Sequence, residues 1–351
     1  MELHENLLWL CGIASPSGGE SKLADELNQR LAALSLPAPI RRYDHSLVVP
    51  ISRDTRGPKI ALVGQLDVAD AGQPGPPRLE GDSVIGAGTA DAKSGLCLML
   101  DLAERPPTLH ADLTLVFHAR GELGFDGSAL GPVLRKDSEL AKTELALVLK
   151  PSDNKLQLGS GGSTQATLAV RGRTAHSGLI RAGDNAIHKF AGVLNRLATY
   201  EPVADVVDGL TWYESICATS VHGGRGGSVV PDDLEVNAHH TFGPSTSSHD
   251  SQDKLMALMD RIGAVRFEEL SRSAAPNRAH PLIRSLEQSG VLGVEARQTW
   301  TEVARFTALG IAAATFGPGA ERAAHSRSES IEISQLALAR SILDRWFAGM
   351  S

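Results

Sequence analysis

Gln65 and Asp67 are polar residues that directly follow an apolar run, residues 60–63, in the block Gly64–Val68. A short, uninterrupted apolar run is typical of a buried strand. Open α/β sheets bind ligands and carry out chemistry beyond the carboxyl ends of their strands. The block therefore places an amide and a carboxylate where a functional site is expected.

A second block, Gly86–Gly95, is rich in glycine and brings Asp91 to the start of a helix that we predict over Lys93–Glu104. The carboxylates of Asp67 and Asp91 would then converge on one cleft. Gly-Asp pairs are also common in turns and loops. Taken alone, the two blocks leave an ordinary pair of loops as the alternative.

Two further predicted strands, residues 112–116 and 144–149, are also followed by polar side chains. His118 and Glu122 come after the first strand, and Lys150 comes after the second. Strands alternate with helices throughout this part of the chain. We therefore expect an α/β fold with a mostly parallel central sheet.

The pattern changes after residue 163 to a strand, a helix, two strands (residues 212–221 and 228–241), a helix and a strand. This order predicts an α+β layer with two helices on one face of a sheet. The last strand and the C-terminal amphipathic helix lack a core of their own, so we expect them to rejoin the first domain. The expected domains are residues 1–163 with 276–351, and residues 164–275 as an insertion.

The composition excludes several classes of protein. The chain has 351 residues, a formal net charge of -7 and no dense lysine or arginine run, which argues against a nucleic-acid-binding surface. Its cysteines, Cys11, Cys97 and Cys217, are far apart and predict reduced thiols. The apolar run at residues 7–14 is short and follows two glutamates. We therefore expect a cytoplasmic protein without a signal peptide or membrane span.

Five motifs occur in a fixed order at residues 86–95, 172–177, 183–189, 300–306 and 316–325. Together they resemble the M20 family of zinc peptidases and amidohydrolases, and within it the actinobacterial succinyl-diaminopimelate desuccinylases. The resemblance extends from about residue 5 to residue 348. It implies a zinc-aminopeptidase-like catalytic domain and an inserted lid domain through which two copies form a homodimer.

The resemblance also implies two zinc ions that share one bridging carboxylate, a position that Asp91 matches. Glu122 and His325 match the remaining protein ligands of one ion, and both residue types suit zinc. We therefore predict a metal site formed by Asp91, Glu122 and His325. The predicted cofactor is one zinc ion at most, with an empty site as the alternative.

The second ion of the family has lost its ligands in this sequence. Gln65 replaces a histidine and Lys150 replaces a carboxylate, although Asp67, which would orient the histidine, remains. A neutral amide is a poor zinc ligand, and an ammonium group repels a dication. We predict that Lys150 takes the place of this ion and pairs with Asp91. Gly121 replaces the glutamate that serves the family as general base.

Substrate-facing positions differ from the family as well. The resemblance implies arginines and an asparagine around a succinyl carboxylate, and Gly161, Thr241 and Ser228 align with these positions. Without bidentate partners, succinyl-diaminopimelate is not the expected ligand. Asn185, Ser228 and Arg225 are our predicted substrate-binding residues, although Arg225 also fits a solvated loop. His176 matches a histidine that reaches the partner's active site and steadies an oxyanion, and a simple turn is its alternative.

Two functions follow from these residues. The first is a repurposed enzyme that acts on an N-acyl amino acid or amide-linked metabolite, with Lys150, His176, Gln65 and Asp67 as its catalytic residues. Proton shuttles contribute ~10²–10⁴-fold in rate, so Gly121 predicts weak or absent hydrolysis by the family mechanism. The second is a catalytically dead pseudo-hydrolase that serves as a binding or partner protein.

Overall fold

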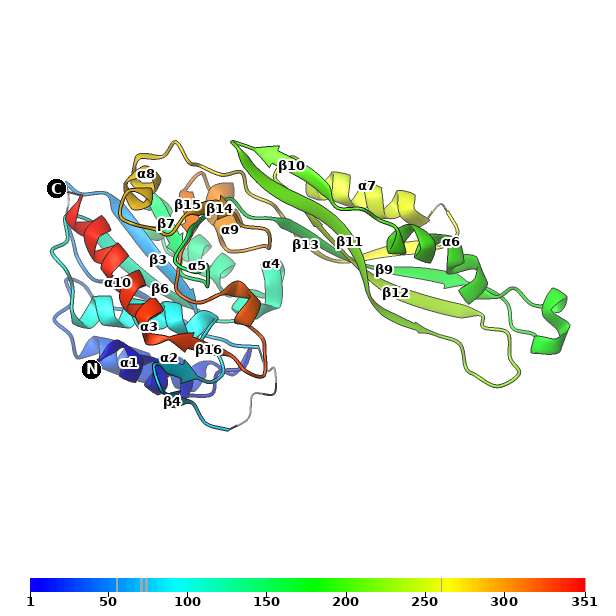
Figure 1. Cartoon of the computed structure of the whole chain (residues 1–351), viewed down its shortest axis with the longest axis horizontal. Helices are drawn as coiled ribbons and strands as arrows, with labels where there is room; N and C mark the ends of the chain where they lie inside the picture. Colours follow the sequence, from blue (N-terminus) through cyan, green and yellow to red (C-terminus); the bar gives the residue numbers. More distant parts are fainter. Residues whose placement is uncertain (55, 70–71, 73–74, 260, 351) are drawn as a thin grey trace. The chain divides into compact units, whose positions relative to one another are not determined.

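The computed structural model describes residues 1–54, 56–69, 72, 75–259 and 261–350. The chain forms two compact units, both drawn in Figure 1. The first unit consists of Met1–Gly159, Pro276–Glu295 and Thr301–Ser351. The second unit consists of Ser160–Ala275 and Ala296–Trp300.

An eight-stranded sheet forms the centre of the first unit, in the order β1-β2-β6-β3-β7-β15-β8-β14. The four inner strands run parallel to one another: β6 (Asp112–His118), β3 (Lys59–Gln65), β7 (Leu145–Val148) and β15 (Ala312–Thr315). Their outer neighbours, β2 beside β6 and β8 beside β15, pair with them antiparallel. The outer strands are β1 (Arg41–Tyr43), β2 (Ser46–Pro50), β8 (Leu156–Leu158) and β14 (Val294–Ala296). The predicted α/β class with a mostly parallel sheet is confirmed.

Helices enclose this sheet because its inner strands are apolar on both faces, as parallel strands usually are. Helix α3 packs against β3 and contacts α1 and α10 (Figure 1). Residues 92–103 of α3 are all buried, so this helix is central and not amphipathic. The helices are α1 (Leu3–Cys11), α2 (Ser21–Ala32), α3 (Ala92–Glu104), α4 (Gly124–Gly127), α5 (Leu130–Lys136), α8 (Pro281–Glu287), α9 (Val303–Ala308) and α10 (Ile333–Ala348).

Short elements complete the first unit. A three-stranded sheet has the order β16-β5-β4. Its strands are β4 (Arg78–Glu80), β5 (Ser83–Ile85) and β16 (Ser330–Glu332), and the 3-10 turns are η1 (Gly121–Leu123), η2 (Leu140–Lys142) and η4 (Glu321–Ala323). Within the part of the chain that the structure describes, no helix has the length and apolar character needed to cross a bilayer.

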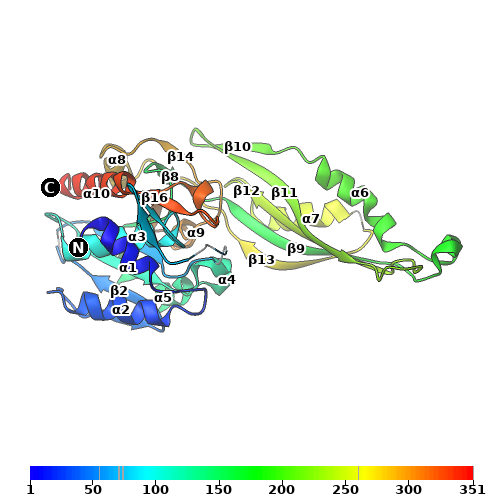
Figure 2. The same cartoon turned by 60° about the horizontal axis from the view of Figure 1, so that its bottom comes forward.

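The second unit is an antiparallel sheet with helices on one face (Figure 2). Its strands, in order, are β10 (Val203–Val207), β11 (Leu210–Gly223), β12 (Asp233–Phe242), β9 (Gly162–Arg171) and β13 (Ala264–Ser271). Helices α6 (Ala186–Ala198) and α7 (Ser248–Met259) cover the apolar face, and η3 (Ser177–Ala182) precedes α6.

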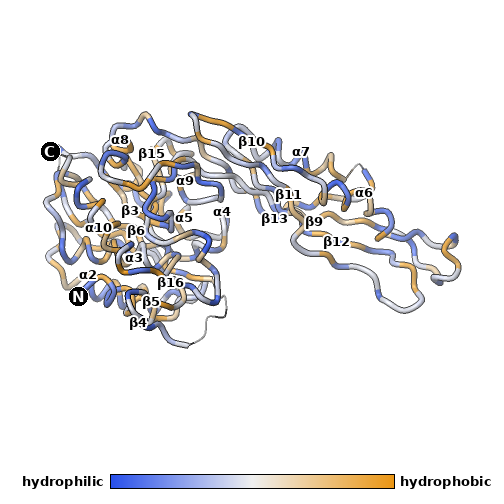
Figure 3. Tube along the Cα trace, viewed as in Figure 1, coloured by the Kyte–Doolittle hydropathy of each residue, from blue (hydrophilic) through white to orange (hydrophobic). Residues whose placement is uncertain are grey.

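Alternating side chains form the core of the second unit. Hydrophobic and hydrophilic positions follow one another along β9 and β12 (Figure 3). Leu168, Val236 and Ala238 project toward the helices and pack with Phe190 of α6 and Leu255 of α7. One face of the sheet is therefore buried by helices, and the opposite face is polar, as expected for an α+β layer.

Two boundaries in the second unit differ from the sequence prediction. Strand β12 begins at Asp233, whereas the prediction began it at Ser228. Gly224, Gly226 and Gly227 adopt positive φ, so the segment before β12 turns instead of pairing. Strand β10, Val203–Val207, was not predicted at all.

Candidate metal site at the strand ends

The inner strands deliver polar residues to one edge of the sheet, as their order requires. Asp67 follows β3, Glu122 follows β6 and Lys150 follows β7, and β3 lies between the other two strands. The carboxyl ends of parallel neighbours meet at the same edge. The structure therefore brings together three of the residues that the sequence analysis selected.

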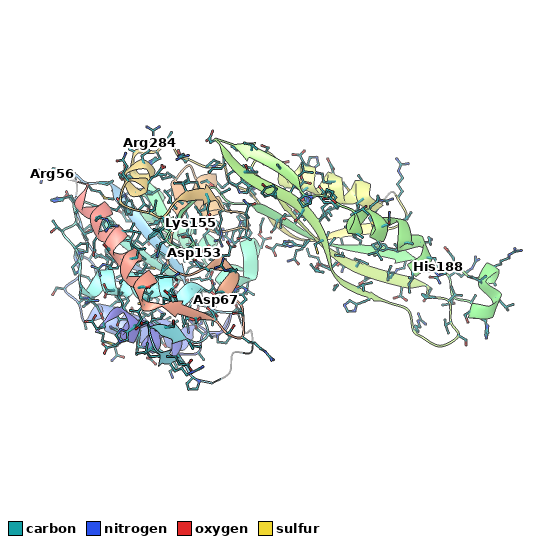
Figure 4. The ribbon with its side chains drawn as sticks, viewed as in Figure 1. Arg56, Asp67, Asp153, Lys155, His188 and Arg284 are labelled. Atoms are coloured by element: carbon teal, nitrogen blue, oxygen red, sulfur yellow. The ribbon has the colours of Figure 1, made fainter. Side chains whose placement is uncertain are left out.

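Asp67 is fully buried and orders the turn that carries Glu122; Figure 4 marks its position in the first unit. Its Oδ1 accepts a hydrogen bond from the Gly121 backbone N–H at 2.6 Å. Its Oδ2 accepts from the Glu122 N–H at 2.9 Å and from the Ser17 hydroxyl at 2.7 Å. Hydrogen bonds to a carboxylate are among the stronger ones, so Asp67 holds the Glu122 backbone in place.

Asp91, Glu122 and His325 form a cluster whose ligand atoms all lie within 4.8 Å of one another. His325 Nε2 lies 3.3 Å from Asp91 Oδ2 and 3.5 Å from Glu122 Oε2. Tetrahedral zinc with bonds of about 2.1 Å keeps its ligand atoms about 3.4 Å apart. Two carboxylates and one imidazole at these distances fit a single divalent metal ion.

The backbone conformation of the preceding loop positions Asp91, and His325 has an unusual backbone conformation of its own. Gly88 has φ of +83°, and a Cβ there would lie 2.7 Å from Val68 Cγ1, so the loop before Asp91 requires glycine. The Ala90 N–H donates to Glu329 Oε1 at 2.9 Å. Burial raises the pKa of Glu329 to about 7. His325 itself has a left-handed backbone, with φ of 57°.

The electrostatics of the cluster favour a cation. Hydrogen bonds to Asp91 and then Glu122 raise the pKa of His325 to about 10. The two carboxylates therefore bind either a proton on the imidazole or a metal ion beside it. Metal binding displaces such a proton, because a ligating imidazole must be neutral.

Gln65 lies beside this cluster and presents a hydrogen-bond donor to it. Its side chain is buried, and its Nε2 donates to the Asp67 carbonyl at 3.2 Å and to Glu122 Oε1. An amide NH2 group directed at Glu122 carries partial positive charge toward that carboxylate. Among the described residues, Gln65 Oε1 has no hydrogen-bond partner.

Gly121 leaves room for the side chain of Gln65, which packs directly against its backbone. A Cβ atom at residue 121 would lie 2.5 Å from Gln65 Oε1 and 2.6 Å from its Cβ. Such distances are far inside van der Waals contact, so a side chain at 121 requires Gln65 to move. Neither Gln65 nor Gly121 offers an anionic ligand for a divalent ion.

Lys150 acts electrostatically on two buried groups at the same sheet edge. Burial alone would raise the pKa of Glu302, but the Lys150 and His118 charges hold it below its ordinary value. His118 Nε2 lies 3.6 Å from Glu302 Oε1, and burial lowers the pKa of His118. The predicted pairing of Lys150 with Asp91 stays a prediction.

The sequence analysis did not select Glu302. Its only sequence signal is its place inside the motif at residues 300–306, between Thr301 and Val303. An acidic residue before a short helix is usually interpreted as an N-terminal cap. Its complete burial depends on the fold and has no local pattern.

The remaining predicted residues belong to the second unit. His176 Nδ1 accepts from the Gly178 N–H at 3.1 Å and caps η3. Asn185 Oδ1 accepts from the N–H groups of Ile187 at 2.9 Å and His188 at 3.1 Å, and so caps α6. Hydrogen bonds of this kind suit the turn alternative for His176 as well as a role in binding.

Ser228 and Arg225 lie on the glycine-rich turn before β12. The Ser177 N–H donates to the Ser228 carbonyl at 2.8 Å, which joins this turn to the His176 segment. Arg225 is exposed and lies 3.4 Å from an Asp232 carboxylate oxygen. His176, Ser228 and Arg225 therefore share one end of the second unit.

Comparison with known protein families identifies a domain that corresponds to most of the second unit. The sequence model described as a peptidase dimerisation domain, M20_dimer, matches residues 158–265. The structure also resembles a tripeptidase from Staphylococcus aureus with a TM-score of 0.81. The two chains are 19% identical, and the alignment covers 99% of this chain and 98% of the tripeptidase.

Two curated relatives align with nearly the whole chain. It is 32% identical over 341 residues to a Mycobacterium tuberculosis protein proposed to be a succinyl-diaminopimelate desuccinylase, covering 97% of this chain and 96% of the relative. It is 28% identical to the succinyl-diaminopimelate desuccinylase of Corynebacterium glutamicum, covering 97% and 94% of the two chains. The chain belongs to the M20 peptidase family of metallohydrolases and is related to the actinobacterial succinyl-diaminopimelate desuccinylases.

Proposed function

We propose that this chain is a divergent amidohydrolase that acts on an N-acyl amino acid or amide-linked metabolite with one divalent metal ion at most. The observation that carries this proposal is the Asp91–Glu122–His325 cluster, whose spacing suits one ion. Zinc is the expected metal, given the family and the mixed nitrogen and oxygen ligands. Gln65 and Lys150 argue against a second ion.

Different residues of this chain would bind the metal ion, position its ligands and attract the substrate. Asp91, Glu122 and His325 would hold the ion, which when bound polarises a substrate carbonyl and lowers the pKa of bound water. Asp67 keeps Glu122 in position through the backbone of the following turn. Lys150 supplies a fixed positive charge that can attract a substrate carboxylate or a developing oxyanion.

A catalytically inactive binding protein is the second candidate function. Gly121 specifically favours it, because the position of the family's general base carries no carboxylate and is closed by Gln65. A protein of this kind would keep the fold and the dimer while binding a ligand or an active relative. Its substrate turnover would be absent even when metal is bound.

We also propose a homodimer formed through the second unit. Strand β10 pairs with β11 only as far as Glu214, and no described strand pairs with the outer edge of β11 beyond that residue. Helix α6 and β11 border an apolar groove of about 620 Å³. Leu194 and Val221 on this groove are 53% and 64% exposed, which is unusual for large apolar side chains without a partner.

Metal content and turnover test the proposed function together. Protein loaded with excess zinc and desalted should retain about one ion per chain, and His325→Ala should retain far less. A panel of N-acyl amino acids would then be assayed with wild type and Lys150→Ala. Lys155→Ala is the matched control, since Lys155 forms a surface pair with Glu295 at 2.9 Å.

The outcomes separate the candidates. One ion per chain with turnover that Lys150→Ala reduces and Lys155→Ala preserves supports the enzyme. One ion without turnover of any substrate supports the binding protein. Two ions per chain, or rapid hydrolysis that Lys150→Ala leaves unchanged, would contradict the proposed role of Lys150.

A further inference from the structure

Glu20 is a buried carboxylate that the proposed chemistry does not use. It immediately precedes α2, where an acidic residue usually caps the helix. Within the described part of the chain, however, its side chain makes no capping hydrogen bond to α2. Glu20 is 0% exposed, and burying a carboxylate is costly unless hydrogen bonds compensate for the lost water. The contacts that this carboxylate does make should therefore show what its burial achieves.

The hydrogen bonds of Glu20 join two segments that are distant in the sequence. Its Oε1 accepts from the backbone N–H groups of Gly18 and Arg120, each at 2.9 Å. The first bond is local. The second bond spans 100 residues and reaches the turn that follows β6 and carries Glu122. Glu20 therefore ties the segment before α2 to a turn of the candidate metal site.

Arg120 has the unusual backbone conformation in this turn. Its φ of 57° and ψ of 38° are left-handed, a region that residues with a Cβ rarely adopt unless the surrounding structure holds them there. This conformation leads the chain out of β6 and into η1, where Glu122 lies. The hydrogen bond to Glu20 holds Arg120 from outside its own turn.

Two carboxylates together hold three consecutive backbone N–H groups. Arg120 donates to Glu20. The next two residues, Gly121 and Glu122, donate to the two oxygens of Asp67. Hydrogen bonds to carboxylates are among the stronger ones. The backbone that carries Glu122 is therefore fixed at three successive residues, and Glu20 fixes the first of them.

We infer that Glu20 is a positioning residue for Glu122. Through the Arg120 N–H it holds the left-handed backbone that directs the turn, and it shares with Asp67 the task of fixing where the Glu122 side chain begins. The inference rests on the proposed function in one respect, the role of Glu122 as a metal ligand. The part that Glu20 plays in fixing the turn depends on no metal ion.

Hydrogen exchange of the metal-free protein, followed by NMR, tests the fixing of the turn. Glu20→Ala removes the acceptor, so the N–H groups of Arg120, Gly121 and Glu122 should exchange about tenfold faster or more than in wild type. Glu20→Gln keeps an accepting oxygen and should retain most of the protection. If Glu20→Ala does not fold, Glu20→Asp takes its place, because the shorter side chain withdraws the acceptor from Arg120.

Asp137→Ala is the matched control. Asp137 is also buried, and its Oδ1 accepts from the backbone N–H groups of Glu139 and Leu140 at 3.0 and 3.2 Å. These two residues precede the amino end of β7, whereas Glu122 follows the carboxyl end of β6. The control should speed exchange at Glu139 and Leu140 and leave the Arg120 turn protected.

A substitution at residue 120 separates positioning from a general loss of stability. Glycine adopts a left-handed backbone without steric cost, so a glycine at this position makes the turn less dependent on Glu20. Glu20→Ala/Arg120→Gly should therefore recover part of the protection at Gly121 and Glu122 that Glu20→Ala loses. If Glu20 acted only on its own segment, this change would recover nothing.

Zinc affinity, measured by competition with a chelator, tests the consequence for the cluster. Loss of a group that orients a metal ligand typically costs 10–100-fold in metal affinity. Glu20→Ala should therefore weaken zinc binding by about tenfold or more. Glu20→Gln and Asp137→Ala should bind zinc about as tightly as wild type, although both are expected to lower stability.

The outcomes separate this inference from the proposed function. Unchanged exchange of the Arg120 turn in Glu20→Ala would overturn the inference, whether or not the chain binds zinc. Faster exchange combined with zinc binding as tight as in wild type would also overturn it, because the turn would then not position Glu122. A wild type that binds no zinc contradicts the proposed function instead, and hydrogen exchange then decides whether Glu20 fixes the turn.

Discussion

At the scale of single residues, Gln65 occupies the space that any side chain introduced at Gly121 would need. A Cβ on residue 121 would meet Gln65 Oε1 at 2.5 Å, and Gln65 is itself fixed by Asp67 and Glu122. A side chain at residue 121 and the present position of Gln65 therefore exclude each other.

Gly121→Ala should lower the free energy of unfolding by about 1–3 kcal/mol, because it overpacks a buried contact. Gln65→Ala/Gly121→Ala should recover part of this loss by removing the colliding amide. Urea unfolding measures both. Gly192→Ala is the control, since its Cβ would meet only Arg196 Nη1 at 3.8 Å within α6, and it should be neutral or stabilising. Equal losses in both glycine variants would contradict the proposed collision.

Restoring the family's residues tests the residue matching itself. The triple variant Gln65→His, Gly121→Glu and Lys150→Glu should bind about two zinc ions per chain, because both halves of the site then offer suitable ligands. Metal analysis after desalting measures the stoichiometry against wild type. A triple variant that folds and still binds one ion or none would show that these positions are wrongly matched.

The metal cluster could be predicted at residue level, and the buried carboxylate of Glu302 could not. Asp91, Glu122 and His325 each lie in a motif, and the structure brings all three together. Their role as ligands stays a prediction. Glu302 has no comparable signal, since its complete burial depends on the packing of α9 on the sheet.

At the scale of elements, Asn185 shows how one residue can suit two interpretations. Its side chain caps α6 through two backbone N–H groups, which accounts for its residue type without any substrate. Asn185→Ala should therefore cost about 1 kcal/mol of stability, whereas Asn185→Asp should keep the cap. Chemical denaturation measures both variants. An alanine variant as stable as wild type would refute a capping role.

A buried histidine in the second unit should make stability depend on pH. His240 on β12 is fully buried, with Nδ1 2.7 Å from Ser251 Oγ and Nε2 3.2 Å from Glu214 Oε1. Burial lowers the pKa of His240, while Glu214 opposes this shift and Lys254 adds to it. The unfolded chain therefore binds a proton more readily than the folded chain. Stability should fall as pH drops below about 6.5, by at most about 1.4 kcal/mol per pH unit.

His240→Gln removes this titration, so its stability difference from wild type should shrink between about pH 7 and pH 5. Urea unfolding at several pH values measures it. The other buried histidine near a carboxylate, His118, is present in both proteins and cancels in the comparison. A difference that is constant over this range would mean that His240 does not take up a proton on unfolding.

Strand and helix types were largely predictable, while certain boundaries were not. The apolar run before Gln65 and the helix after Asp91 lie where periodicity placed them. Strand β10 escaped prediction because all five of its residues are exposed or half-buried, so it has no alternation of buried and exposed positions. The early start predicted for β12 followed from apolar Val229 and Val230, which precede the strand in the turn segment.

At the scale of the whole molecule, the open edge of β11 and the α6 groove predict an assembly. Leu194→Asp and Val221→Asp each place a charge on the apolar groove between α6 and β11 and should convert a dimer into monomers. Light scattering during size-exclusion chromatography measures the mass. Leu292→Asp is the control, because Leu292 is 61% exposed in the first unit and should not affect the mass. A wild-type monomer, or a dimer that survives both groove variants, would contradict the assembly.

The interlocking of Gln65 with the bare backbone of residue 121 has a consequence for substitution. A side chain introduced at position 121 would arrive where the amide of Gln65 already lies. The two positions should therefore accept change together more readily than one at a time, because each change alone leaves the other residue in place.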